Sequence, residues 1–171
     1  MAHRRRLTMS LTRHAHERLP GAIVELILPL ASVWVKRQEL LILRAGVPLS
    51  SALIVAARHI GVLFPERVRL LKVAEVPPMH PFIRFGARKI GFYSDLTRGM
   101  SLRYGIFIRS DYWNKRSLVV HELAHTRQYE RLGGVRRFLR QYLHECLVSP
   151  GYPFGPLEQE AKKIEGEIGG S

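Results

Sequence analysis

The chain has 171 residues, of which 46% are hydrophobic and 24% are charged, and its formal net charge is +13. This length supports one domain with a core of its own but is short for two, and the composition argues against disorder over most of the chain. The single cysteine, Cys146, excludes an internal disulfide and any zinc site built from several thiolates. It fits a reducing compartment, so we expect a cytoplasmic protein.

The first 45 residues divide into two segments. Residues 1–18 contain five arginines and little apolar content, and we expect them to form a flexible basic tail. Residues 19–45 are mostly apolar helix formers that end before a glycine suited to a helix C-cap. The apolar run within them is short for a membrane span and contains Glu25 and Pro29, which favours a helix that docks on the core or lies on a membrane surface.

Residues 46–171 are predicted to form one domain of the α+β class. Capping residues and apolar periodicity indicate helices at residues 51–60, 117–132, 135–147 and 156–168. Alternating and β-branched residues indicate strands at residues 68–76 and 100–109. The expected architecture is a small sheet packed on the helix at 117–132, with further helices before and after it.

The basic excess lies upstream of that helix. Lys and Arg outnumber Asp and Glu by 9 to 3 in residues 1–60 and by 11 to 4 in residues 61–116, whereas residues 117–171 hold 7 of each. Such a basic half favours contact with an anionic surface, either lipid or nucleic acid. Residues 82–93 interleave aromatic and basic side chains, but no nucleic-acid-binding motif accompanies them. An anionic membrane surface is therefore the preferred partner, and nucleic acid the second.

The sequence HELAH at residues 121–125 is the strongest functional signal. On a helix, His121 and His125 project from the same face one turn apart, as two imidazoles must to reach one metal ion. Glu122 is rotated by about 100° from His121, from where it can act as a general base toward a water at that metal. The alternative is a polar stripe on an amphipathic helix. Three apolar residues precede the pair, and two desolvated histidines need a partner, which favours the metal.

A catalytic zinc site needs a third protein ligand. The helix at 156–168 offers Glu158 and Glu160, which flank its apolar stripe at comparable angles, so periodicity does not choose between them. Glu158 also falls at the third helical position, where a carboxylate stabilises a helix start without any metal. Gln128, one turn beyond His125, is placed either to hydrogen-bond to a metal ligand or to face solvent.

These two helices resemble the gluzincin branch of zinc metallopeptidases. In that branch HELAH is followed, in a later helix, by a glutamate in the pattern Glu-x-x-Ala-polar, and this glutamate is the third zinc ligand. The matching sequence here is EQEAK at residues 158–162, which points to Glu158. Lys162 departs from the pattern, because such families carry Asp or Asn there to orient a ligating histidine. A longer pattern over about residues 60–165 is similar to small bacterial proteins of the HExxH metallopeptidase type.

The resemblance implies a zincin-like minimal domain and a zinc-dependent peptidase acting on a peptide or protein substrate. Its implied Zn²⁺ ligands are His121, His125 and Glu158, with Glu122 activating water. The strand before the metal helix would pair through a free edge with an extended substrate. The implied substrate-binding residues on that strand are Arg103, Gly105 and Phe107.

Two further expectations concern the chemistry of the site. Tyr152, in the loop before the last helix, would stabilise the oxyanion of the reaction. The alternative to an enzyme is an inactive binding module, in which zinc clamps the last helix to the core and the basic half contacts a membrane surface or nucleic acid. Both hypotheses predict zinc, and only catalysis separates them.

Overall fold

A mixed sheet lies between the helices of the domain. The computed structural model describes residues 2–76, 97–147 and 151–170, and their side chains from residue 21 onward. Its strands run in the order β1-β2-β4-β3, with β2 and β4 parallel and the other two pairs antiparallel. They are β1 (Val47–Pro48), β2 (Arg69–Val73), β3 (Gly99–Leu102) and β4 (Gly105–Arg109). The predicted α+β class is therefore confirmed.

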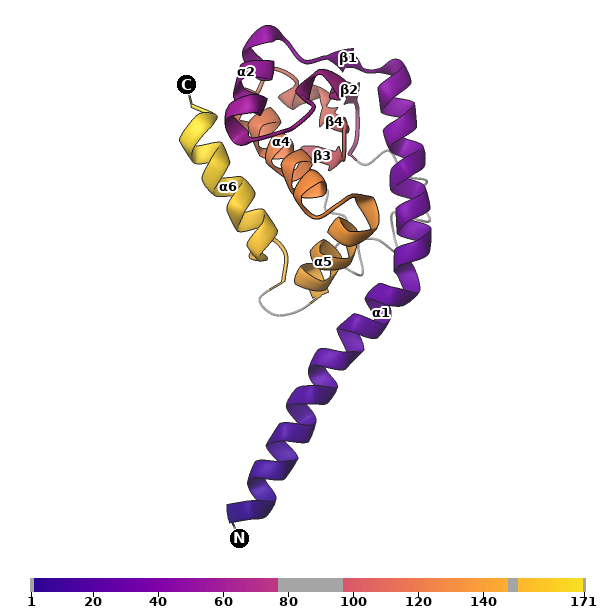
Figure 1. Cartoon of the computed structure of the whole chain (residues 1–171), viewed down its shortest axis with the longest axis vertical. Coiled ribbons are helices and arrows are strands. Elements are labelled where there is room, and N and C mark those ends of the chain that lie inside the picture. Colours follow the sequence, from indigo (N-terminus) through magenta and orange to yellow (C-terminus); the bar gives the residue numbers. More distant parts are fainter. Residues whose placement is uncertain (1, 77–96, 148–150, 171) are drawn as a thin grey trace.

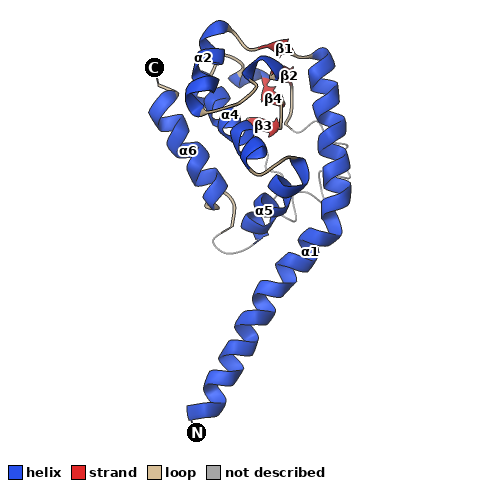
Figure 2. Cartoon of the chain, viewed as in Figure 1, coloured by secondary structure: helices blue, strands red, loops and turns tan. Residues whose placement is uncertain are grey.

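Helices make up most of the described chain (Figure 2). The four helices predicted downstream of residue 46 are all present, each within about one residue of its expected bounds. The helices are α1 (Ala2–Ala45), α2 (Ser51–Ile60), α4 (Arg116–Arg131), α5 (Val135–Leu147) and α6 (Pro156–Ile168). Short 3₁₀ turns lie at Pro65–Arg67 and Ser110–Tyr112.

The single strand predicted at residues 100–109 is in fact a hairpin of two strands. The chain turns between Leu102 and Gly105, which pair with each other, and Arg103 in this turn has a positive φ of 69°. Alternation of apolar residues runs through the turn without a break, so the sequence pattern did not reveal it. As a result β4 lies inside the sheet, between β2 and β3. The prediction of a free edge at Gly105 and Phe107 is therefore wrong, and among the described residues that edge belongs to β3.

Both faces of β4 are buried. Phe107 packs in a cluster with residues of α1 and α5, while Ile106 and Ile108 pack in a second cluster with the first turns of α4. Gly105 is needed on the α1 side, because a Cβ at this position would lie 2.9 Å from the Ile42 Cβ atom. The burial of both faces explains why this strand is apolar on its two sides.

α1 is one continuous helix from Ala2 to Ala45 (Figure 1). Of the segment 1–18 that was expected as a flexible tail, residues 2–18 are thus part of the same helix as the apolar segment at residues 19–45. The stretch from residue 2 to residue 19 contains neither glycine nor proline, which accounts for a helix that extends through it. The described part of α1 packs on α5 and on the sheet, with Val24 and Ile42 among its buried residues.

Residues 82–93, the basic and aromatic stretch, lie outside the described residues. Within the described chain, no helix combines the length and the apolar composition that crossing a bilayer takes.

Candidate metal centre

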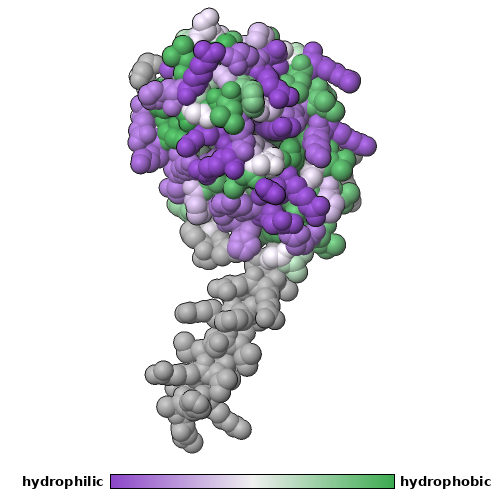
Figure 3. Space-filling view, in the orientation of Figure 1, coloured by the Kyte–Doolittle hydropathy of each residue, from purple (hydrophilic) through white to green (hydrophobic). Residues whose placement is uncertain are grey.

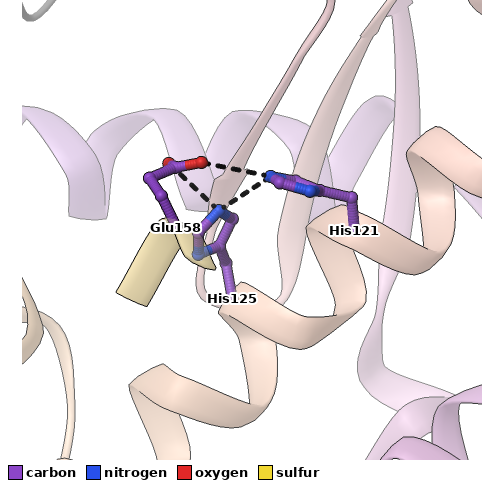
Figure 4. Close-up of side chains that lie close together, drawn as sticks. All are labelled: His121, His125 and Glu158. Atoms are coloured by element: carbon purple, nitrogen blue, oxygen red, sulfur yellow. Dashed lines mark hydrogen bonds and ion pairs between the residues drawn. The ribbon is translucent and has the colours of Figure 1, made fainter. Parts of the chain in front are cut away.

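Three side chains from two helices converge at the centre of the domain (Figure 4). The Nε2 atoms of His121 and His125, both on α4, lie 3.2 Å apart. The Glu158 carboxylate, from the first turn of α6, lies 3.5 Å from His121 Nε2 and 3.4 Å from His125 Nε2. His125 and Glu158 are 6% and 5% exposed. The three ligand atoms could hold a metal ion, since they all lie within 4.8 Å of one another.

The spacing of these atoms can be compared with that of the ligands around a tetrahedral zinc ion. Ligand atoms about 2.0–2.1 Å from a tetrahedral ion lie about 3.3 Å from one another. The two Nε2 atoms lie 3.2 Å apart, close to that value, and each Nε2 atom lies within 3.5 Å of a different oxygen of the Glu158 carboxylate. A donor set of two imidazoles and one carboxylate leaves a fourth tetrahedral position open, as catalytic zinc sites require.

Gln128 fixes which nitrogen of His125 carries the proton. Its side-chain NH₂ donates to the Leu157 carbonyl at 2.9 Å and to Glu160 at 3.0 Å, so its amide oxygen must act as an acceptor. That oxygen lies 2.8 Å from His125 Nδ1, which therefore donates to it. The His125 Nε2 lone pair is left pointing at Glu158 and His121, as a metal ligand needs.

Glu165 orients the His121 ring as Gln128 orients the His125 ring. Its carboxylate oxygen lies 3.2 Å from His121 Nδ1, so the ring donates there and its Nε2 atom faces the cluster, where it can bind a metal ion once it has lost its proton. Glu165 lies two helical turns after Glu158, on the same side of α6. Lys162, at the position where the resemblance predicts an orienting Asp or Asn, instead lies over the Phe154 ring at 5.9 Å. Glu165 was not predicted from the sequence, although its spacing of seven residues from Glu158 was a legible signal.

Glu160, the alternative third ligand, faces away from the histidines. Its carboxylate accepts hydrogen bonds from Arg127 at 3.0 Å and from Arg131 at 2.7 Å. It is further held by the side chain of Gln128. With these partners Glu160 has no contact with the histidine pair, so the structure brings Glu158 and not Glu160 to the cluster.

An aromatic wall on α5 supports the cluster from the other side. The Tyr142 hydroxyl donates to the Glu158 carboxylate at 2.6 Å. Tyr142 stacks on Phe138, and both rings meet the edge of the His125 ring at about 6 Å between centroids. Burial and the neighbouring Glu158 charge raise the pKa of Tyr142 well above its usual value, so the phenol remains a donor. The sequence predicted the helix that carries Tyr142, at residues 135–147, but did not single out this residue.

The buried cluster contains one carboxylate and two imidazoles but no permanently charged cation. Burial disfavours the charged form of His121, but hydrogen bonding to Glu158 and the charges of Glu122, Glu158 and Glu165 outweigh burial and raise the pKa of His121 to about 9. Burial opposes ionisation of Glu158, yet its contacts with His121 and His125 and the hydrogen bond from Tyr142 hold the pKa of its carboxyl well below the usual range. At neutral pH the cluster therefore holds a proton, which its nitrogen and oxygen atoms share. A metal cation can replace this proton.

Glu122 lies beside the cluster and takes no part in it. It is 4% exposed, and burial raises the pKa of its carboxyl. β3 makes room for it at Gly99, because a Cβ on Gly99 would lie 2.6 Å from the Glu122 Oε1 atom. Gly99 is a second residue that was not predicted, since nothing in the pattern distinguishes it from a turn glycine.

A pocket opens over these side chains. β3 forms one wall with residues 99–102, and Phe138, Leu139 and Tyr142 of α5 form another. Tyr152 lines the pocket from the loop before α6 and is 46% exposed. Partial burial, with a smaller effect from Glu158, raises the pKa of Tyr152 to about 12, so its phenol is protonated at neutral pH.

The residues predicted to bind substrate do not reach this pocket. Gly105 and Phe107 are buried within the sheet, and Arg103 lies in the turn with its guanidinium 4.9 Å from the Tyr104 ring centroid. The turn is held by hydrogen bonds to α4, the helix that carries His121 and His125. The Thr126 hydroxyl donates to the Arg103 carbonyl at 2.8 Å and lies 3.2 Å from the Ser101 hydroxyl.

Comparisons with protein-family models, with curated proteins and with solved structures found no match.

Proposed function

We propose that this chain is a zinc-dependent hydrolase with a zincin-like domain, and that it cleaves peptide bonds. One observation supports this proposal above the others. Two imidazole Nε2 atoms lie 3.2 Å apart and each lies within 3.5 Å of a Glu158 carboxylate oxygen, while the Nδ1 atom of each imidazole has an acceptor of its own. Beside them lies Glu122, a carboxylate that is buried and free of the ligand set.

The ligands would be His121, His125 and Glu158. When bound, Zn²⁺ supplies Lewis acidity, which lowers the pKa of a coordinated water to about 7 and polarises a carbonyl group. Gln128 and Glu165 hold the two imidazole rings in place, and this orientation raises their basicity as ligands.

Glu122 acts as the general base in this proposal. Its raised pKa brings the carboxyl closer to the pH at which it can both accept a proton and return it to the leaving amine. Gly99 keeps the carboxylate in its position. Tyr152, whose phenol lines the pocket and stays protonated, is placed to donate a hydrogen bond to the oxyanion.

The substrate would bind along β3. This strand lines the pocket, and among the described strands it pairs only with β4. Backbone pairing between an extended peptide and a strand gives affinity with little dependence on the substrate sequence. The apolar wall that includes Met100, Phe138 and Leu139 favours an apolar side chain next to the scissile bond.

The test combines metal analysis with a matched pair of variants. We expect purified protein to carry one zinc per chain and to cleave an unfolded protein substrate. Glu122→Gln should keep the zinc and lose cleavage by at least about a hundredfold, the lower range for removing a general base. Glu167→Gln, an exposed change on α6, is the control and should cleave like wild type. Absence of zinc contradicts the metal site. Zinc with equal cleavage by Glu122→Gln and wild type, or with none from either, points to the inactive zinc-stabilised module.

A further inference from the structure

The outer face of α1, away from the core, is apolar. Leu26 and Leu30 are each 78% exposed and Val33 is 50% exposed. We call this face the outer ridge; it consists of Ile23, Leu26, Leu30, Val33, Leu40 and Leu41. The ridge is opposite the buried positions of the same helix, such as Leu28 and Val35. A helix that merely covers a core carries polar residues on its outer face, so this second apolar face indicates a second partner.

Basic residues continue the ridge toward the end of α1. Arg37 and Arg44 follow Leu30 at intervals of seven residues, which places them in line with it, and Lys36 is exposed beside them. Figure 3 shows hydrophobic and hydrophilic surface side by side along the right-hand edge, where α1 runs. The first 20 residues, on the same helix, add five arginines against one glutamate.

The charges of the ridge argue against a second copy of the chain as its partner. Two ridges packed together would bury Arg37 and Arg44, and burying an unpaired cation is costly. The acidic residues in the described part of α1 do not offer a partner: Glu25 is bound by Arg140, and Glu39 is buried on the inner face. At a lipid surface the same arginines extend toward headgroup phosphates while the leucines stay in the apolar layer.

We propose that the outer ridge docks α1 on the surface of an anionic lipid bilayer, with the helix lying parallel to the membrane plane. The leucines enter the boundary between headgroups and acyl chains, and Lys36, Arg37 and Arg44 contact lipid phosphates. The net charge of +13 draws the protein to such a surface. This docking does not depend on the metal centre, so its test is independent of the test of the proposed hydrolase.

The experiment is co-sedimentation of the full chain with vesicles of phosphatidylcholine, with and without phosphatidylglycerol. We expect binding to the anionic vesicles that weakens in high salt. Leu26→Gln/Leu30→Gln should lower partitioning by at least about tenfold, because each leucine loses its apolar burial. Arg37→Gln/Arg44→Gln should lower it by about fivefold for each residue on anionic vesicles and leave the weak binding to neutral vesicles unchanged.

The matched control is Val55→Gln/Leu63→Gln. These two residues are 66% and 68% exposed on another part of the domain and should bind vesicles like wild type. Circular dichroism and thermal melting of all variants check that the fold is intact. The proposal is overturned if wild type fails to sediment with anionic vesicles, or if the ridge and control variants bind equally. Light scattering that shows a lipid-free dimer, lost in Leu26→Gln/Leu30→Gln, would also overturn it in favour of a second copy.

Discussion

α4 and α6 are joined at two places of opposite character. On the inside, His121 and His125 meet Glu158, and all three side chains are largely buried. On the outside, Arg127 and Arg131 bind Glu160, whose side chain is 26% exposed. Both clusters tie the same two helices together, and their carboxylates lie only two residues apart in the sequence.

The difference between the clusters lies in their charge balance. The outer cluster is complete, because Glu160 has two permanent cations within hydrogen-bonding distance. The inner cluster has a carboxylate and two imidazoles that are charged only when protonated, so it depends on a proton or a metal ion for its positive charge. A buried cluster of this kind responds to pH and metal, whereas an exposed ion pair contributes little and responds mainly to salt.

The largest difference between the two clusters is expected when Glu158→Gln is compared with Glu160→Gln. Zinc at 100 to 1,000 times its dissociation constant should stabilise wild type and Glu160→Gln by about 2.7 to 4.1 kcal/mol. Glu158→Gln should gain little, because it loses the anionic ligand of the inner cluster. Thermal melting with and without zinc measures the difference. Loss of the zinc effect in Glu160→Gln alone would reverse our assignment of the third ligand.

A smaller effect is expected at Glu165. Glu165→Ala removes the acceptor for the Nδ1 proton of His121 and should weaken zinc binding by about 10- to 100-fold, as the loss of such supporting groups does. Glu165→Gln keeps an acceptor oxygen and should recover part of that loss. Competition with a chromophoric chelator measures the affinities. Glu167→Ala, two residues further along α6, is the control, and an equal loss in this variant would mean a general effect of charge on α6.

The pH dependence of zinc binding tests whether the inner cluster holds a proton in the absence of metal. The pKa of His121 is raised to about 9 in the metal-free protein, so below that pH the ring holds a proton that zinc must displace. The apparent affinity for zinc should therefore rise by about tenfold per pH unit, up to about pH 9. This slope applies above the pH range in which the other ligands lose their protons. Titration calorimetry in buffers of different ionisation enthalpy counts the released protons. An affinity that is constant between pH 7 and pH 9 would contradict a protonated His121 in the metal-free cluster.

The smallest effect belongs to the outer cluster. Arg131→Gln removes one exposed partner of Glu160, and Arg127 remains. We expect a loss of at most about 1 kcal/mol in the free energy of unfolding, measured by urea denaturation, and no change in zinc affinity. A larger loss, or a weakened metal site, would mean that the two clusters are coupled through Gln128, which touches both.

The sequence was informative where a residue pattern matches a local geometry. HELAH placed two imidazoles on one face because a helix of 3.6 residues per turn requires it, and caps and periodicity located the helices downstream of residue 46. The choice between Glu158 and Glu160 was different, because both flank the apolar stripe and only the approach of α6 to α4 separates them. The resemblance to gluzincins pointed to Glu158, and the structure places that residue beside the histidines.

Contacts between distant segments were beyond the reach of these patterns. The turn at Arg103 is hidden because the apolar alternation passes through it, and this error moved the expected substrate edge from β3 to β4. The contact of Tyr142 with Glu158 depends on how α5 packs against the start of α6, which a local pattern does not contain. Gly99 is explained only by the carboxylate of Glu122, which lies 23 residues away in the sequence.

The attachment of the β-hairpin to α4 has a consequence for where a bound peptide would be cut. Thr126 follows His125 directly and holds the carbonyl of Arg103, at the end of β3, with a hydrogen bond of 2.8 Å. The strand and the histidines are therefore fixed at a constant offset along one another. In the proposed reaction, a peptide paired with β3 and shifted by one residue would turn its other side-chain face to the pocket, and a shift of two residues would restore the first face. Any side-chain preference of the pocket would therefore favour cut sites that lie an even number of residues apart in an alternating substrate sequence.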